Sequence, residues 1–233
     1  MKNILRKIYN KVKATRIKEG DYPSAEDFIE VIEDNYEFIT SQDILLDRIL
    51  ACGYFGCVFR TKNEGWVAKI TADFYEYLLV DEVFHKPLPG FALYKDVRNL
   101  NSEHWLFIRE EIIPLEKSKK RDVKKIKDDL LTIVSIYLKS FGVDQPHYDY
   151  VEPLDPFDAF EIMESISLET FPIANSLRKM FESGFLIGDL HIKNVGLSKR
   201  DNRLLFYDAQ IHGRPSEFEL ERYKKRKESG SIW

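Results

Sequence analysis

The segment from Phe185 to Gln210 constrains the fold of this chain more than any other. Its apolar residues form short runs around an Asp201-Asn202 turn, a pattern typical of two antiparallel strands. Polar residues stand at both ends of this hairpin, Asp189 and Asn194 before it and Asp208 after it. Because a hairpin brings its ends together, we expect Asn194 and Asp208 to lie close to one another.

These three polar residues suit a particular chemistry. Asp189 and Asn194 are five positions apart on a loop held by strands, which suits a carboxylate base next to a substrate hydroxyl. The amide oxygen of Asn194 and the carboxylate of Asp208 are ligands for a hard cation such as Mg²⁺. Each aspartate alone can equally be a turn residue or a helix cap, so the interpretation depends on their combination.

The amino-terminal half is predicted to form an antiparallel sheet. Residues 44–51 and 58–71 are rich in β-branched and aromatic side chains, and Asn63-Glu64-Gly65 predicts a tight hairpin turn. Residues 73–85 have helical spacing, and we expect two further strands over 92–97 and 104–112. The result is a small sheet with one inserted helix.

The carboxy-terminal half has mostly helical spacing. Residues 116–141 predict a long helix with buried later turns, and residues 167–184 a second helix closed by its final glycine. A Pro- and Asp-rich loop over 144–158 separates them. The predicted fold class is α+β, with a sheet lobe over 43–112 and a helical lobe over 113–233 that carries the hairpin.

Residues 1–42 precede these lobes as a basic helical extension. Apolar residues recur at helical spacing within it, and Ser24 with Asp27 resembles a capping box that opens a helix through about Tyr36. Such a basic amphipathic helix can lie on an anionic membrane or contact nucleic acid. Packing of the apolar stripe on the body of the same protein is the preferred interpretation; its members are Ile4, Leu5, Ile8, Tyr9 and Val12.

Composition excludes several classes of protein. With 35 Lys and Arg against 39 Asp and Glu, the net charge of −4 is too small to imply a nucleic-acid or membrane partner. No stretch approaches the ~20 apolar residues of a membrane span, and we expect a cytoplasmic protein. Cys52 and Cys57 are interpreted as small strand residues of a reducing compartment, although oxidation or a covalent ligand there would affect the intervening glycines.

Two further features lie in the predicted sheet. In ACGYFGCV (51–58) the backbone N–H groups around Gly53 and Gly56 can bind phosphate oxygens, although glycines beside strands more often mark a hairpin or bulge. Lys69 needs an anion if its strand position faces inward, and otherwise reaches solvent at a strand edge. Glu76 and Glu82 lie on different faces of the next helix, and we expect Glu82 to be the partner because it follows the apolar pair Leu78-Leu79 by one turn.

Together these segments resemble the protein kinase-like phosphotransferases over residues 43–212. ACGYFGCV resembles the glycine-rich nucleotide loop, and Val67-Ala68-Lys69 resembles the strand whose lysine holds ATP phosphates. Asp189 and Asn194 match the catalytic loop in type and spacing, and Asp208 matches the metal-binding aspartate.

The resemblance has informative departures. Ala51 stands where the first loop glycine is usual, and Ile187-Gly188 replaces the His-Arg of ordinary protein kinases. The sequence Gly-Asp-Leu-His-x-x-Asn is closer to the aminoglycoside and choline phosphotransferases and related atypical kinases. Asp208-Ala209-Gln210 stands in place of Asp-Phe-Gly.

The resemblance implies a bilobal kinase-like fold and an ATP- and Mg²⁺-dependent transfer of the γ-phosphate to a hydroxyl. Asp189 would accept the hydroxyl proton, Asn194 and Asp208 would bind Mg²⁺, and His191 would shape the loop or contact substrate. Lys193 would assist near the phosphate or remain solvated. The nucleotide would be contacted by Gly53, Gly56, Val58, Lys69, Glu82, Glu110 and Ile112.

The acceptor is less defined. No Lys or Arg occurs between Lys139 and Arg178, and an acidic surface there would attract a cationic small molecule or a basic peptide, unless these residues are solvated or cap helices. After Asp208 no Ala-Pro-Glu appears and little chain remains for docking peptides. A pseudokinase that binds a nucleotide or partner without catalysis is the alternative. The acidic residues are Asp144, Asp149, Glu152, Asp155, Asp158, Glu161, Glu164 and Glu169.

Overall fold

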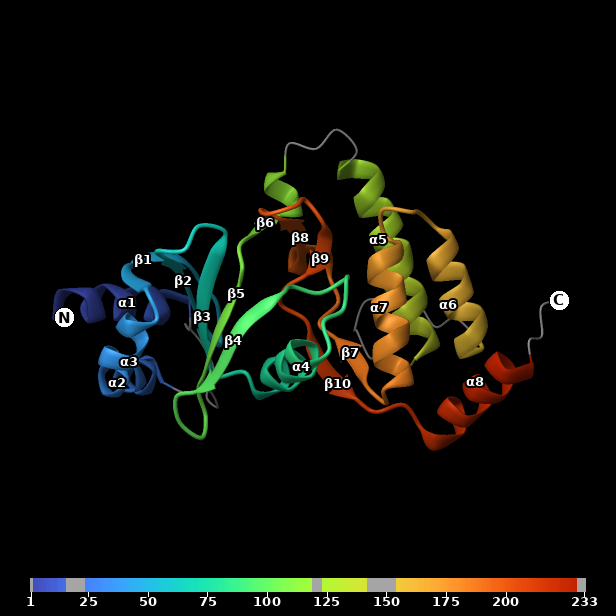
Figure 1. Cartoon of the computed structure of the whole chain (residues 1–233), viewed down its shortest axis with the longest axis horizontal. Helices are drawn as coiled ribbons and strands as arrows, with labels where there is room; N and C mark the ends of the chain where they lie inside the picture. The colour runs from blue at the N-terminus through green and yellow to red at the C-terminus, as the bar shows by residue number, and fades with distance from the viewer. Residues whose placement is uncertain (1, 16–23, 119–122, 142–153, 230–233) are drawn as a thin grey trace. The chain divides into compact units, whose positions relative to one another are not determined.

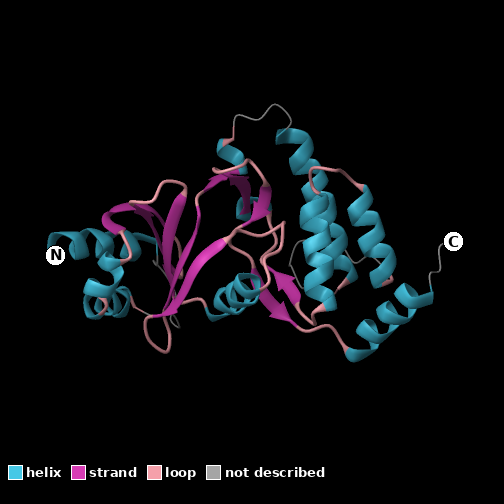
Figure 2. Cartoon of the chain, viewed as in Figure 1, coloured by secondary structure: helices cyan, strands magenta, loops and turns pink. Residues whose placement is uncertain are grey.

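The structure is a computed structural model that describes residues 2–15, 24–118, 123–141 and 154–229. The chain forms two compact units (Figures 1 and 2). The first contains residues up to 86 together with 93–111, and the second contains 87–92 and the chain from 112 onward. The architecture is mixed α+β, as predicted, with an antiparallel sheet in the first unit and mostly helices in the second.

Five strands make up the sheet of the first unit within the described residues, and every neighbouring pair is antiparallel. The predicted hairpin turn is confirmed: Gly65 has φ 77°, and the Trp66 N–H donates to the Asn63 carbonyl at 3.2 Å. In spatial order the strands are β1 (Ile44–Cys52), β2 (Gly56–Thr61), β3 (Trp66–Thr71), β5 (Trp105–Glu110) and β4 (Tyr94–Asn99).

Three amino-terminal helices cover one face of this sheet: α1 (Lys2–Thr15), α2 (Ala25–Asp34) and α3 (Tyr36–Ser41) (Figure 1). The apolar stripe of α1 shares one buried core with Phe59 and Ile70 of the sheet, so the predicted packing on the protein itself is confirmed. Ser24 and Asp27 form the predicted capping box, and the helix that they open ends at Asp34, slightly earlier than expected.

The opposite face of the sheet carries α4 (Phe74–His85), the inserted helix. Asp73 caps it by accepting the N–H groups of Tyr75 and Glu76, which fixes its first turn. Val80 of this helix packs with Trp105 and Phe107 of β5. This is also the face of Lys69, because Lys69 and Phe107 are directly paired across β3 and β5.

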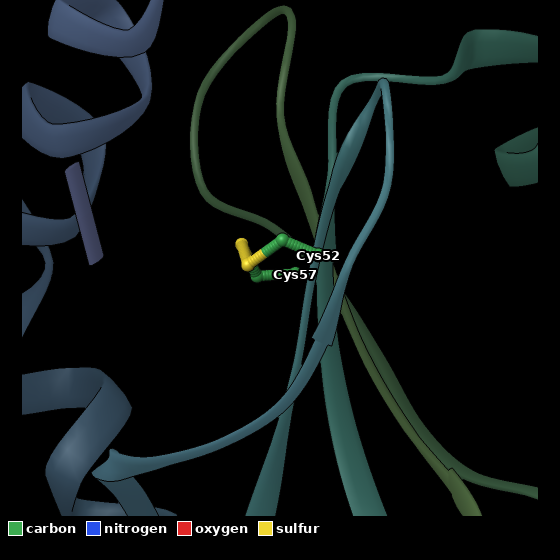
Figure 3. Close-up of a disulfide and its surroundings, with 2 residues drawn as sticks. All are labelled: Cys52 and Cys57. Atoms are coloured by element: carbon green, nitrogen blue, oxygen red, sulfur yellow. A yellow bond between two sulfur atoms is a disulfide. The ribbon is translucent and has the colours of Figure 1, made fainter. Parts of the chain in front are cut away.

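Cys52 and Cys57 form a disulfide that closes the hairpin between β1 and β2 (Figure 3). The interpretation as two independent strand residues was wrong, because the hairpin register places them directly opposite each other. Cys57 is also paired with Ile70, so the disulfide lies on the face that the amino-terminal helices cover. It is therefore on the other side of the sheet from Lys69.

The helices of the second unit pack around an aromatic core. α5 (Val123–Ser140), α6 (Pro156–Ser165) and α7 (Phe171–Glu182) surround it, and α8 (Glu217–Ser229) adds Tyr223 to it. α7 begins four residues later than predicted, and Gly184 follows its end with φ 86°, as expected for a helix-closing glycine. The core rings are Tyr137, Phe141, Phe160, Phe181 and Tyr223.

The strands of the second unit confirm the predicted hairpin. β8 (Val195–Ser198) and β9 (Leu204–Phe206) pair around a turn in which Asn202 has φ 59°. Two neighbouring pairings complete this region: β6 (Ile112–Pro114), continued by the 3₁₀ turn η1 (Leu115–Lys117), joins β8, and β7 (Leu186–Gly188) pairs with β10 (Gln210–Gly213). None of the helices in the described ranges combines the length and apolar composition that crossing a membrane requires.

Candidate functional site

The predicted site residues form two groups, one within each unit. In the first unit Lys69 on β3 donates to Glu76 on α4, with 2.6 Å between Nζ and Oε1. Both side chains are buried, so the lysine has the carboxylate partner that an inward position requires. The second oxygen of Glu76 accepts a hydrogen bond from the hydroxyl of Thr71 at 3.1 Å.

The expectation that Glu82 pairs with Lys69 was wrong. Glu82 accepts instead from Lys86, one turn later on the same helix and outside the core. The buried stripe of α4 contains Glu76, Val80 and Val83, at spacings of four and seven residues from Glu76. The two glutamates are six positions apart, which places Glu82 on a different side of the helix from this stripe.

Thr71 was missed in the sequence. It is two residues after Lys69 and therefore on the same face of β3, and it is fully buried. Its hydroxyl also accepts the N–H of Asp73, which links the end of β3 to the cap of α4. The sequence did contain a signal for it, because residues two positions apart on a strand lie on the same face.

The glycines of the predicted nucleotide loop have structural roles. The Gly53 N–H donates to the Gly56 carbonyl at 2.8 Å, so this group is already used within the turn. A Cβ at Gly56 would lie 2.0 Å from the Ile70 carbonyl oxygen, so only glycine permits this approach of β2 to β3. Val58 lies directly opposite Lys69 and on the same face of the sheet.

Two of the predicted nucleotide contacts, Glu110 and Ile112, belong to different units. Glu110 is fully buried and accepts the N–H of Leu93 through its carboxylate at 2.8 Å. Its backbone N–H donates to the Leu93 carbonyl at 3.0 Å. The Glu110 side chain therefore fastens the chain before β4, while Ile112 lies in β6 opposite Ser198.

In the second unit Asn194 connects the other two predicted residues. It ends the 3₁₀ turn η2 (Ile192–Asn194), and its Nδ2 is 2.8 Å from the Asp189 carboxylate and 3.2 Å from the Asp208 backbone carbonyl. The expected proximity of Asn194 and Asp208 is confirmed. Tyr207 supports it by donating its N–H to the Asn194 carbonyl at 3.0 Å.

His191 contacts the remaining side of Asp189. Its Nε2 is 3.2 Å from Oδ1 of Asp189, while Oδ2 accepts from Asn194. The hydrogen bond to Asp189 raises the pKa of His191, against partial desolvation. Nδ1 of His191 is buried and has no hydrogen-bond partner within the described chain. His191 therefore holds a carboxylate oxygen, a contact that neither of the predicted roles included.

The backbone around Asp189 has an uncommon conformation that the sequence did not reveal. Asp189 has φ 52°, in the left-handed region, and it follows β7 directly. Buried Tyr137 on α5 supports this position, because its hydroxyl accepts the N–H of Ile187 at 2.9 Å. Burial raises the pKa of Tyr137, so it remains a neutral phenol.

The donor set of the second group fits a hard cation in part. Because Nδ2 of Asn194 is directed to Asp189 and Asp208, Oδ1 is the atom of this amide suited to bind a cation. Among the described residues no cluster of three or more His, Cys, Asp or Glu side chains suitable for a metal occurs. Any ion at this place would keep several waters or phosphate oxygens as ligands, as Mg²⁺ does.

Ion pairs engage much of the predicted acidic surface. Asp155 caps α6 and pairs with Arg222 and Arg226 of α8, and Asp158 also pairs with Arg226. Glu164 lies 2.9 Å from Arg178 and is half-buried, and desolvation raises its pKa. Glu161 and Glu169 stay exposed. The predicted members Asp144, Asp149 and Glu152 lie outside the described residues.

Comparison with known proteins finds similarity to solved structures. No protein-family model matches the chain, and no curated protein matches it in sequence. Among solved structures, the chain is similar to the kinase PK-1 of Cydia pomonella granulovirus, with 14% identity and a TM-score of 0.43. The match covers 81% of this chain and 62% of the viral kinase, so this chain spans less than two thirds of that protein's length.

Proposed function

We propose that this chain is an ATP- and Mg²⁺-dependent phosphotransferase of an atypical kinase type, which moves the γ-phosphate to a hydroxyl. The observation that carries the proposal is the arrangement of the second group. One amide, Asn194, lies within hydrogen-bond distance of the Asp189 carboxylate and of the Asp208 backbone. A proton acceptor and candidate metal ligands therefore lie together at the ends of one short hairpin.

Asp189 orients the acceptor hydroxyl and takes its proton late in the transfer. Asn194 and His191 each hold one oxygen of its carboxylate, so its direction is fixed before substrate binds. About 40% of its side chain is exposed, which leaves the carboxylate accessible to a substrate. Preorganisation of this kind reduces the entropy that is lost when the hydroxyl is aligned.

Lys69 neutralises charge on the phosphates that are not transferred, and Glu76 with Thr71 fixes the position of its ammonium group. Mg²⁺, when bound, neutralises the developing charge on the transferred group. Asn194 and Asp208 are the residues that would hold it. Val58 lies beside Lys69 on the same sheet face, where it would form an apolar floor for the nucleotide.

The acceptor in this proposal is a hydroxyl of a protein or of a small molecule. Glu161 and Glu169 are exposed acidic residues of this stretch and favour a cationic acceptor.

The test follows release and transfer of label from γ-labelled ATP with Mg²⁺ by the full chain and by Asp189→Asn. Asparagine keeps the shape and tolerates positive φ, so the rate should fall by about 10²–10⁴-fold without unfolding. Asp201→Asn is the matched control, because Asp201 lies at the turn of the same hairpin and pairs there with its neighbour Arg203. It should retain the parental rate.

Two other results would change the conclusion. One is that Mg·ATP stabilises the parent thermally but not Lys69→Met, and that no turnover depends on Asp189. This result would support the pseudokinase alternative. Absence of both nucleotide binding and turnover would reject both kinase-like functions.

A further inference from the structure

The charge of this chain is distributed very unevenly. Its first 18 residues contain seven Lys and Arg and no Asp or Glu, whereas the remaining 215 contain 28 Lys and Arg against all 39 Asp and Glu. The net charge of −4 is therefore the sum of a strongly basic amino-terminal segment and an acidic remainder of the chain. A local field of this kind acts on partners within about a Debye length, irrespective of the total charge.

The described part of this basic segment is α1, which is fixed on its own sheet. Leu5, Ile8 and Val12 are at most 3% exposed and belong to the same core as the sheet. Because this apolar stripe is already buried, α1 cannot insert it into a bilayer. The side chains that remain at the surface include five bases, Lys2, Arg6, Lys7, Lys11 and Lys13.

The outward surface of α1 has a three-part arrangement. At about 100° per residue, Asn3 and Asn10 lie within roughly 15° of the direction opposite the buried stripe. Both asparagines are exposed. Asn3 and Asn10 thus form a ridge along the outward side of the helix. The basic side chains lie roughly 50–90° to either side of this ridge, with Lys2, Arg6 and Lys13 on one flank and Lys7 and Lys11 on the other.

Hydrogen bonds to neutral groups direct Lys7 and Lys13 without removing their charge. The ammonium group of Lys7 donates to the backbone carbonyl of Asp47 at 3.3 Å, and that of Lys13 to the Tyr9 hydroxyl at 3.1 Å. Tyr9 in turn donates to Glu26, and the hydrogen bond to Tyr9 raises the pKa of Lys13. Glu26 lies close to Lys13 and offsets part of its charge. The other four basic side chains are exposed at the surface.

We propose that α1 is a binding surface for duplex DNA, with its ridge of asparagines in the major groove. A helix is about 10–12 Å across and the major groove of B-DNA is about 12 Å wide, so the two flanks of cations would face phosphates of opposite strands. Amide side chains are suited to the edges of nucleobases, and Lys and Arg side chains are suited to phosphates. Duplex RNA does not offer this fit, because its major groove is deep and narrow.

The test measures fluorescence anisotropy of a labelled 20-base-pair DNA duplex with the full chain at several salt concentrations. The variant K2Q/R6Q/K7Q/K11Q should bind more than tenfold more weakly at low salt. The slope of log K against log salt should become shallower by about 3.6, since each phosphate contact contributes about 0.9. The matched control K124Q/K125Q/K224Q/K225Q removes the same charge from exposed lysines of α5 and α8 and should bind like the parent.

A single substitution provides an independent test. Asn10→Glu places a carboxylate on the exposed ridge, away from the buried stripe, and should weaken DNA binding severalfold while the melting temperature stays unchanged. Circular dichroism of both α1 variants checks that the helix remains folded.

Three results would overturn the proposal. Equal weakening by the quadruple variant and its control would assign binding to overall charge and not to α1. Equal affinity for duplex RNA would exclude the major-groove geometry. Binding to vesicles with 30% anionic lipid, without binding to duplex DNA, would assign the surface to membranes instead.

Discussion

The two groups of candidate site residues differ in how the fold holds them. Lys69 and Glu76 belong to a strand and a helix, are buried, and satisfy each other. Asp189 stands on a short loop with φ 52° and keeps about 40% of its side chain exposed. The first group is part of the core of its unit, whereas the second is an accessible loop fixed by hydrogen bonds.

This difference separates stability from chemistry. A buried ion pair costs much stability when one partner is lost, because the other charge stays desolvated. Removing the charge of a half-exposed carboxylate changes the stability of the protein little, because water already screens that charge. Substitutions in the first group should therefore act mainly on folding, and those in the second mainly on rate.

The largest stability effect is expected for Glu76→Gln. Lys69 is buried and would lose the carboxylate that lies 2.6 Å from its ammonium group, so the free energy of unfolding should fall by about 3 kcal/mol in urea denaturation. Glu82→Gln is the control, because its salt bridge to Lys86 is near the surface, and it should cost less than about 0.5 kcal/mol. Equal effects of the two changes would show that the buried pair is not part of the core.

An intermediate effect is expected for Tyr137→Phe, which tests the support beneath the loop. The N–H of Ile187 would lose its acceptor inside the core, which costs about 1–3 kcal/mol. The proposed phosphoryl transfer should slow at the same time, because β7 leads directly into Asp189. Tyr75→Phe removes an exposed hydroxyl and should leave both the urea midpoint and the rate unchanged.

The smallest effect on stability is expected for His191→Gln, below about 1 kcal/mol for a pair this exposed. The raised pKa of His191 means that its pairing with Asp189 stabilises the fold fully below pH ~6.5 and less as pH rises through the raised pKa. Urea midpoints measured between pH 5 and 9 should lose this component in the variant. An identical pH profile for parent and variant would contradict the pairing.

Local patterns predicted much of the fold. The Asn63-Glu64-Gly65 turn, the Ser24–Asp27 capping box and the hairpin around Asn202 all depend on neighbouring residues, and each is present. The partner of Lys69 was mispredicted because apolar neighbours favoured Glu82, whereas the packing of α4 selects the stripe that contains Glu76.

Other features depend on strand register and backbone conformation, which the sequence does not display. The pairing of Cys52 with Cys57 requires the two strands to meet with these residues opposite each other. The left-handed backbone at Asp189 and the contact of His191 with its carboxylate are both features that the sequence Gly-Asp-Leu-His does not indicate. The site residues could be named from their spacing, but their hydrogen-bond partners could not.

The path of the chain between the two units limits how the protein can be divided. Residues 87–92 belong to the second unit, although the chain then returns to the first before β4. Gly90 donates its N–H to Ser176 and accepts the N–H of Phe206, so this short segment completes a fold built mostly from later residues. If the chain were cut after Glu111, residues 87–92 would remain on the amino-terminal fragment, although they belong to the second unit. The two products should behave as complementing halves of a split protein, and neither unit can be exchanged as a cassette by joining at one position.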